Sequence, residues 1–181
     1  GWNDVAPYYR HYRGNTMHRD HRGRYSEYYV NNTGRNDIVG AKVARDDDNL
    51  YFYVETADRL TPSTDRNWML LLIDTDRDRS TGWNGYDVIV NRLSPDGRKA
   101  IVERNVGGRW EWEKAGEAAM AVSGDKLELS IARSILGLTD DRVDIEFKWN
   151  DNMQENGNIM DFYVNGDTAP GGRFNFVYST L

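Results

Sequence analysis

The sequence predicts an all-β protein, built as a single antiparallel β-sandwich of about ten strands. Three observations favour this fold. Apolar residues alternate with polar ones along many short segments, turn-forming residues separate these segments at hairpin spacing, and only one short stretch has a helical pattern. A chain of 181 residues fits one domain of ordinary size. We therefore expect residues 1–181 to form one jelly-roll-like domain.

The expected strands follow one another closely along the chain. Leu50, Phe52 and Val54 share one face of the segment "NLYFYVET", as the half-buried strand of a sandwich requires. The same alternation recurs in "KLELSIA" and "VDIEFKWN". The predicted strands are 38–45, 49–56, 68–73, 87–93, 100–105, 109–114, 126–132, 143–150, 159–164 and 173–179.

Two segments are expected to lie outside the strands. Residues 133–138, "RSILGL", predict one short helical turn. Residues 10–24 are rich in arginine, and Gly14 and Gly23 would break a helix there, so this stretch is interpreted as a loop. Residues 1–35 as a whole are predicted to be an irregular segment packed on the sandwich.

Composition excludes several classes of function. The net charge of -6 argues against a nucleic-acid partner, which needs a basic surface. The absence of cysteine excludes disulfides and thiolate metal sites. No apolar run is long enough to span a bilayer and no signal-peptide pattern opens the sequence, which is typical of a mature or excised domain.

The stretch "IDTDRDRSTGWNGYD" is the clearest candidate for a metal site. Asp74, Asp76 and Asp78 alternate, and a curled loop with this spacing can aim three carboxylates at one calcium ion. No flanking helices are predicted, so the loop is not an EF-hand. The alternative is a solvated turn in which Arg77 and Arg79 neutralise the carboxylates.

The aromatic residues point to a sugar ligand. Aromatics make up 12% of the chain, with 6 Trp and 11 Tyr against 5 Phe. A pyranose packs its C–H face on such rings, and its hydroxyls take hydrogen bonds from Asn, Asp, Arg and Lys. Trp83, in the Gly-flanked loop "TGWNG", is expected to be exposed. Large aromatics are usually buried, however, so packing in the core is the alternative for each tryptophan.

Four segments together resemble a known family. The succession "DNLYFYVETAD", "NWMLLLIDTDRDRSTGWNGYDVIVNR", "LELSIARSILGL" and "IEFKWNDN" is similar to the family 9 carbohydrate-binding modules and to the wider DOMON-like group of β-sandwiches. The resemblance covers most of the chain from about Asn36 onward. It implies a sandwich that binds sugar between two tryptophan rings with the help of polar side chains, and that holds calcium structurally.

Site residues follow from the resemblance one by one. Lys148 and Asn150 match the late-strand polar contacts, and Asn91 lies in the Tyr-x-x-x-Asn strand. Trp68 precedes the apolar Ile-Asp strand as one stacking ring does, although its spacing to Asp74 is shorter than in the family pattern. The sequence also departs from the family motif at Ala132, where the family has proline. By alternation Trp149 would point into the core. The implied ligand-binding residues are Trp68, Trp83, Asn91, Lys148, Trp149 and Asn150.

Haem is not expected. Some DOMON relatives hold haem between axial Met and His, which must face each other across a pocket. Met69 and Met160 lie in predicted strands, but no histidine does: His11, His18 and His21 all lie in the N-terminal segment. Calcium, bound by Asp74, Asp76 and Asp78, is therefore the one cofactor expected.

These patterns favour a non-catalytic carbohydrate-binding module. We expect it to be monomeric, without a nucleic-acid or membrane partner, and tethered to the catalytic domain of a bacterial glycan-degrading protein that is extracellular, on the cell surface or periplasmic. Two alternatives stay open. One is a polysaccharide-active enzyme, a glycosidase or a Tyr/Arg lyase, although no spacing singles out catalytic residues. The other is a structural spacer domain.

Overall fold

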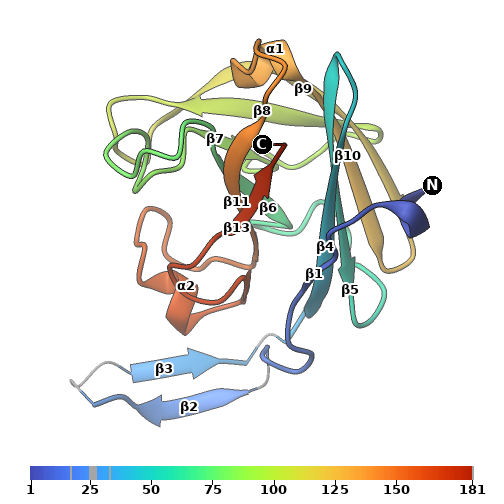
Figure 1. Ribbon diagram of the computed structural model, residues 1–181. Helices are drawn as coiled ribbons and strands as arrows, with labels where there is room; N and C mark the ends of the chain where they lie inside the picture. Colours follow the sequence, from blue (N-terminus) through green and yellow to red (C-terminus); the bar gives the residue numbers. More distant parts are fainter. Residues whose placement is uncertain (17, 25–27, 33, 181) are drawn as a thin grey trace.

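The computed structural model describes residues 1–16, 18–24, 28–32 and 34–180, and its fold is all-β as predicted (Figure 1). The helical segments are η1 (Trp2–Asp4), α1 (Arg133–Leu136) and α2 (Asp161–Val164). The strands are β1 (Tyr9–Arg10), β2 (Arg19–Arg22), β3 (Tyr28–Asn31), β4 (Ile38–Arg45), β5 (Asn49–Thr56), β6 (Leu70–Asp74), β7 (Val88–Val90), β8 (Lys99–Asn105), β9 (Trp112–Ser123), β10 (Lys126–Ala132), β11 (Asp144–Asp151), β12 (Asp167–Ala169) and β13 (Phe176–Ser179).

One antiparallel sheet makes both layers of the sandwich. Its strand order is β1-β4-β5-β10-β9-β8-β7-β6-β11-β12, and β13 also pairs with β11. The sheet curls, so that β4, β5 and β10 face β6 and β11 (Figure 1). Phe52 on β5 therefore meets Phe147 on β11, with ring centroids 5.7 Å apart. The predicted β-sandwich is confirmed.

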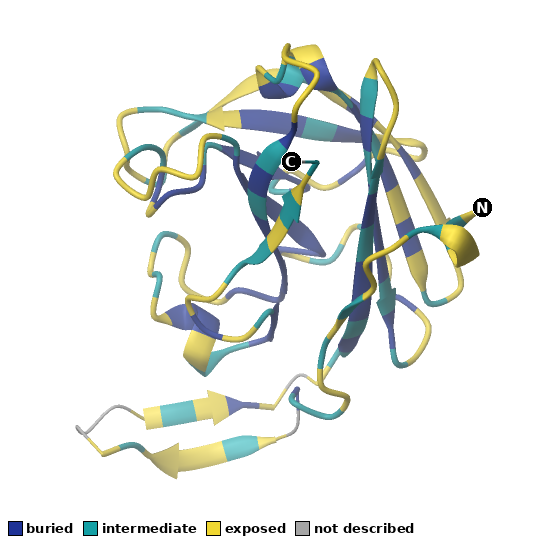
Figure 2. Cartoon of the chain, viewed as in Figure 1, coloured by how far each residue is buried: buried dark blue, intermediate teal, exposed yellow. Residues whose placement is uncertain are grey.

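The main core fills the space inside this curl. Strands β5 and β10 alternate as predicted, and Phe52, Val54, Leu129 and Ile131 are buried on the inner face. Figure 2 shows the same alternation as dark and light bands along these strands. The period-two pattern of the sequence thus records which face of each strand meets the core.

A second apolar cluster covers the outer face of β6 and β7. Leu71 and Ile73 of β6 point into the main core, while Leu70 and Leu72 pack under the loops together with Trp83 and Phe162. Strand β6 is therefore buried on both faces. This explains why its sequence is a continuous apolar run rather than an alternating one.

Most of the predicted elements after residue 36 are confirmed. Three elements in the second half of the chain differ from the prediction: β9, α2 and β12. The 133–138 turn contains α1, which ends at Gly137 in the left-handed conformation. Residues 159–164, predicted as a strand, instead form the turn and helix of α2. Strand β12 was not predicted, and β9 extends to Ser123 through an alanine-rich stretch with weak strand propensity.

The N-terminal segment is more regular than predicted. Instead of an irregular loop, residues 1–35 contain η1, β1 and a β2–β3 hairpin, in which Arg19 pairs with Asn31. The hairpin lies beside α2 and projects from the sandwich (Figure 1). Gly14 and Gly23 disfavour a helix, as predicted, but they do not prevent two antiparallel strands from pairing. No helix in the described part of the chain is long and apolar enough to cross a membrane.

Candidate functional site

The three predicted stacking tryptophans are buried. Trp68 is 1% exposed, in the main core, and donates its indole N–H to the Thr61 carbonyl at 2.9 Å. Trp149 is 0% exposed, as strand alternation predicted. Trp83, predicted to be exposed, is 3% exposed, and its ring centroid lies 4.5 Å from that of Trp110. The exposure of Trp83 was therefore predicted wrongly, because the loop turns its ring into the second cluster rather than toward solvent.

The two late-strand polar residues hold a loop in place. Lys148 is fully buried, and its ammonium group donates to the carbonyls of Pro170 and Gly172 at 2.6 and 2.9 Å and lies 5.2 Å from the centre of the Phe162 ring. Asn150 donates to the Thr168 hydroxyl at 2.8 Å. Both side chains bind the 161–172 segment and offer no exposed surface to a sugar.

Asn91 has a similar internal role. It is 1% exposed, has a left-handed backbone with φ 67°, and donates to the Met69 carbonyl at 3.0 Å. Asn91 thus connects the end of β7 to the residue before β6, and it serves the fold as Lys148 and Asn150 do.

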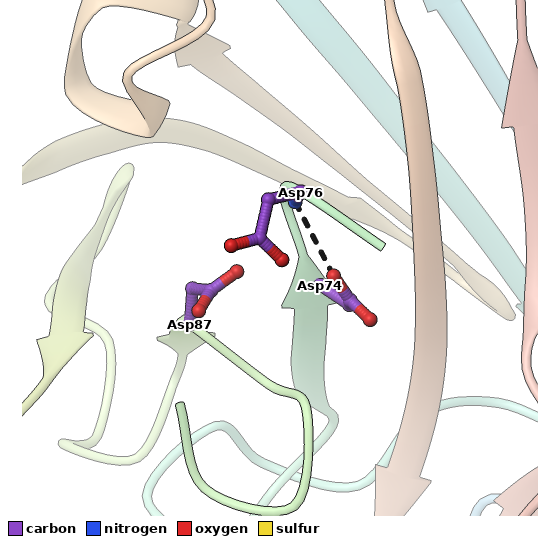
Figure 3. A group of neighbouring side chains, drawn as sticks. All are labelled: Asp74, Asp76 and Asp87. Atoms are coloured by element: carbon purple, nitrogen blue, oxygen red, sulfur yellow. Dashed lines mark hydrogen bonds between the residues drawn. The ribbon is translucent and has the colours of Figure 1, made fainter. Parts of the chain in front are cut away.

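Three carboxylates gather at the end of β6, but they are not the predicted three. Asp74, Asp76 and Asp87 each place an oxygen within 4.8 Å of the others (Figure 3). Asp87 takes the place predicted for Asp78, since pairing of β6 with β7 brings Asp87 beside Asp74. Asp78 instead accepts hydrogen bonds from the backbone and hydroxyl of Ser80 at 2.8 and 2.6 Å.

The arginines of this loop do not neutralise its carboxylates. Arg77 pairs with Asp144 at 3.0 Å, and Arg79 lies 3.7 Å from Glu146, both on β11. Burial, followed by the charge of Asp87, raises the pKa of Asp74 to about 6, although the Arg77 backbone N–H opposes this rise. The buried Oδ2 of Asp74 accepts no hydrogen bond from any described residue. Hard oxygen donors with this excess of negative charge fit a calcium ion.

A polar cleft lies beneath the β2–β3 hairpin, where sequence reasoning placed no site. Its volume is about 230 Å³, and five carboxamide side chains line it. These come from three distant segments of the chain: Asn31, Asn32, Asn152, Gln154 and Asn165. We call this hollow the amide cleft.

The amides divide into a buried support and an available fringe. Asn31 and Asn152 are buried, and Asn31 donates to the Gly166 carbonyl at 3.1 Å. Asn32 is exposed and forms no hydrogen bond to the described residues. Gln154 uses its amide N–H groups on Asn152, which leaves its carbonyl oxygen without a donor in the described structure.

A second hollow of about 190 Å³ adjoins the amide cleft and shares Asn165 and Gly166 with it. Gly166 permits this arrangement, because a Cβ there would lie 1.9 Å from the Asp151 carbonyl oxygen. Arg19 lines the hollow and donates to the Tyr163 carbonyl at 3.1 Å. Arg19 thereby fixes the hairpin against the 161–172 segment. We call this space the Arg19 hollow.

The positions of the histidine and methionine residues differ from those predicted. His21 lies in strand β2, where it stacks on Tyr29 at 5.5 Å. Met69 and Met160 lie outside the strands, Met69 being buried and Met160 half exposed. One histidine, His21, therefore lies in a strand, contrary to the prediction that none does.

No family model, curated protein or solved structure significantly matches this chain. Function must therefore be inferred from the geometry of the site.

Proposed function

We propose that the chain is a non-catalytic carbohydrate-binding module, and that its sugar binds in the amide cleft. The observation that carries this proposal is the lining of one 230 Å³ hollow by five carboxamides. A carboxamide both donates and accepts hydrogen bonds, as a sugar hydroxyl does. A cleft lined by such groups with no formal charge therefore complements a polyhydroxylated ligand better than an ion.

We assign sugar binding to the amide cleft because the tryptophans implied by the resemblance are buried. Sugar recognition needs convergent polar groups on a rigid support. Lys148 and Asn150 supply the support here, because their hydrogen bonds fix the segment that carries Asn165. We further propose that Asp74, Asp76 and Asp87 hold a structural calcium ion, and that the module targets a larger extracellular glycan-degrading protein to its substrate.

Calorimetric titration of the chain against neutral and acidic oligosaccharides tests the proposed function. We expect saturable binding with no change in the size of the glycan. Shortened or unsaturated products would instead identify an enzyme, and silence across the panel would favour a spacer domain.

Asn32→Ala tests the location of the site. Asn32 forms no internal hydrogen bond in the described structure, so its removal leaves the fold intact. Loss of one or two hydrogen bonds to sugar should weaken binding roughly two- to tenfold. Asn3→Ala is the matched control, since Asn3 is also an exposed amide without a described partner but lies in η1. Equal affinities of Asn32→Ala and the unchanged chain would remove the amide cleft as the site.

A further inference from the structure

We infer that the glycan bound by this site carries a carboxylate, which Arg19 in the adjoining hollow binds, so that the ligand class is a uronic-acid-containing oligosaccharide. This inference rests on the proposed function, because the same ligand occupies the amide cleft. It adds the charge and the minimum extent of the ligand.

The two hollows adjoin, and this determines the minimum length of the ligand. They share Asn165 and Gly166, and together they offer about 230 and 190 Å³. The hairpin touches the 161–172 segment at two places, through Asn31 on Gly166 and through Arg19 on Tyr163. A ligand that occupies both hollows must cross the Asn165–Gly166 backbone, which favours two or more sugar units over one.

The guanidinium of Arg19 determines the charge that we expect of the ligand. Its guanidinium donates only to the backbone carbonyls of Tyr163 and Asn15, and no carboxylate within the described structure pairs with it. A guanidinium has five N–H donors. Arg19 therefore keeps both its net charge and spare donors at the wall of the hollow, which suits a planar carboxylate bound through two hydrogen bonds.

Asp167 is the one carboxylate among the described residues that line the same hollow. Asp167 accepts the Ile38 backbone N–H at 2.6 Å through Oδ2, and its Oδ1 lies 3.5 Å from His11 Nε2. Asp167 therefore forms no ion pair with Arg19 in the described structure. Strand β2 also exposes Arg22 and Asp20, one charge of each sign.

A second polar atom near this hollow, Asn15 Oδ1, could accept a hydrogen bond from a hydroxyl group of the ligand. Asn15 also lines the Arg19 hollow, and its amide donor side faces His11 Nε2 at 2.7 Å. The Asn15 Oδ1 atom is buried and has no hydrogen-bond donor among the described residues. A uronic acid presents a carboxylate to Arg19 and ring hydroxyls to such an acceptor, so one sugar unit can satisfy both groups.

The test compares acidic oligosaccharides with their methyl esters by calorimetry of the full chain. Oligogalacturonides, oligomannuronates and glucuronoxylan fragments serve as acids, and each ester has the same shape without the charge. Loss of a charge-assisted hydrogen bond should weaken binding of the ester about ten- to a hundredfold. Added salt should weaken binding of the acid but not of the ester.

Variants assign the charge to Arg19. Arg19→Gln should lower affinity for the acid to that of its ester and leave affinity for the ester unchanged. Arg22→Gln removes the same charge from the same strand and should change neither affinity by more than about twofold, because exposed charges contribute little. Arg19→Lys should retain part of the preference. Thermal melts check that each variant folds.

The outcomes separate the inference from the proposed function. Equal affinity for acid and ester would overturn the inference and leave carbohydrate binding intact. A variant Arg19→Gln that loses the ester as well would make Arg19 a positioning residue and also overturn it, as would equal losses in Arg19→Gln and Arg22→Gln. Preference for sulfated over carboxylated sugars would refute the carboxylate. Absence of binding to every sugar would overturn both proposals.

Discussion

The acidic loop and the amide cleft are both polar regions at loop ends, but they are assembled in opposite ways. The loop from Asp74 to Asp87 is one short stretch that folds on itself through hydrogen bonds between near neighbours. The amide cleft collects side chains from residues 31–32, 152–154 and 165, which are far apart in sequence. A local motif is visible in the sequence, whereas a cleft made by distant segments is visible only in the fold.

The two regions also differ in the contacts that hold them in place. In the loop, Asp74, Asp76 and Asp78 accept backbone N–H groups two or three residues ahead, so the chain itself holds these carboxylates. Asp87 instead accepts the backbone N–H of Thr75 at 2.9 Å. The cleft depends on buried side chains beneath it, above all Lys148 and Asn150. Changes to these distant supports should therefore disturb the cleft and leave the acidic loop intact.

Trp83→Ala tests where the two regions meet, and we expect it to have the largest effect. Trp83 belongs to the acidic loop but packs at 6.0 Å from Phe162 of α2. Removal of a buried tryptophan should lower the free energy of unfolding by about 3–5 kcal/mol. Urea denaturation measures this loss, and Trp2→Ala, at a half-buried ring, should cost less. Intact stability with lost sugar affinity would restore Trp83 as a stacking residue.

Lys148→Ala should break the cleft without touching the acidic loop. The variant leaves the Pro170 and Gly172 carbonyls without their donor in the described structure and opens a cavity beside Phe162. We expect a loss of about 3 kcal/mol in the free energy of unfolding, together with weaker sugar binding. The exposed Lys99→Ala is the control and should leave the stability nearly unchanged, because an exposed ion pair contributes little. Unchanged sugar affinity in folded Lys148→Ala would disprove the dependence of the cleft on this support.

The sandwich was predictable because its signal is local and periodic. In β5 and β10, alternation alone identified the inner residues, such as Phe52 and Leu129, and hence the core. The same rule placed Trp149 in the core. Strand β6 was recognised from its apolar run, although its burial on both faces depends on loops that the strand itself does not encode.

The candidate site was only partly predictable. Two of the three carboxylates, Asp74 and Asp76, were identified, but Asp87 joins them through pairing of β6 with β7, and Asp78 turns away to Ser80. The resemblance implied Lys148 as a sugar contact, but the segment that covers this side chain, residues 161–172, is placed by the fold and not by the strand pattern. For the amide cleft, the high frequency of Asn in 31–36 and 150–158 was a signal, but turn formation accounted for it equally well.

Calcium should affect the acidic loop and not the amide cleft, because no carboxylate is among the described residues that line the cleft. At a concentration about a hundred times its dissociation constant, calcium would add about 2.7 kcal/mol to the stability, which raises Tm by roughly 5–10 °C in a chain of this size. Asp87→Asn should abolish most of this rise. Asp78→Asn is the matched control from the same loop and should retain it. The reverse pattern would favour the carboxylates predicted from spacing alone.

The smallest expected effect is a pH dependence that originates beneath the cleft. Burial lowers the pKa of Lys148 to about 7, whereas the two carbonyls and the Phe162 ring favour the ammonium form. Between about pH 7 and the ordinary lysine pKa, the unfolded chain binds a proton that the folded chain has lost, so the free energy of unfolding should rise with pH. The rise cannot exceed about 1.4 kcal/mol per pH unit for one proton.

Urea denaturation between pH 7.5 and 9 measures this slope, and Lys148→Met should abolish it. The window ends near pH 10, because burial raises the pKa of Tyr9 to about 12, and an unfolded tyrosine that ionises first reverses the trend. A flat profile in the unchanged chain would mean that Lys148 stays protonated when buried. The carbonyls of Pro170 and Gly172 would then outweigh desolvation, and the cleft would rest on a buried positive charge at every pH of this range.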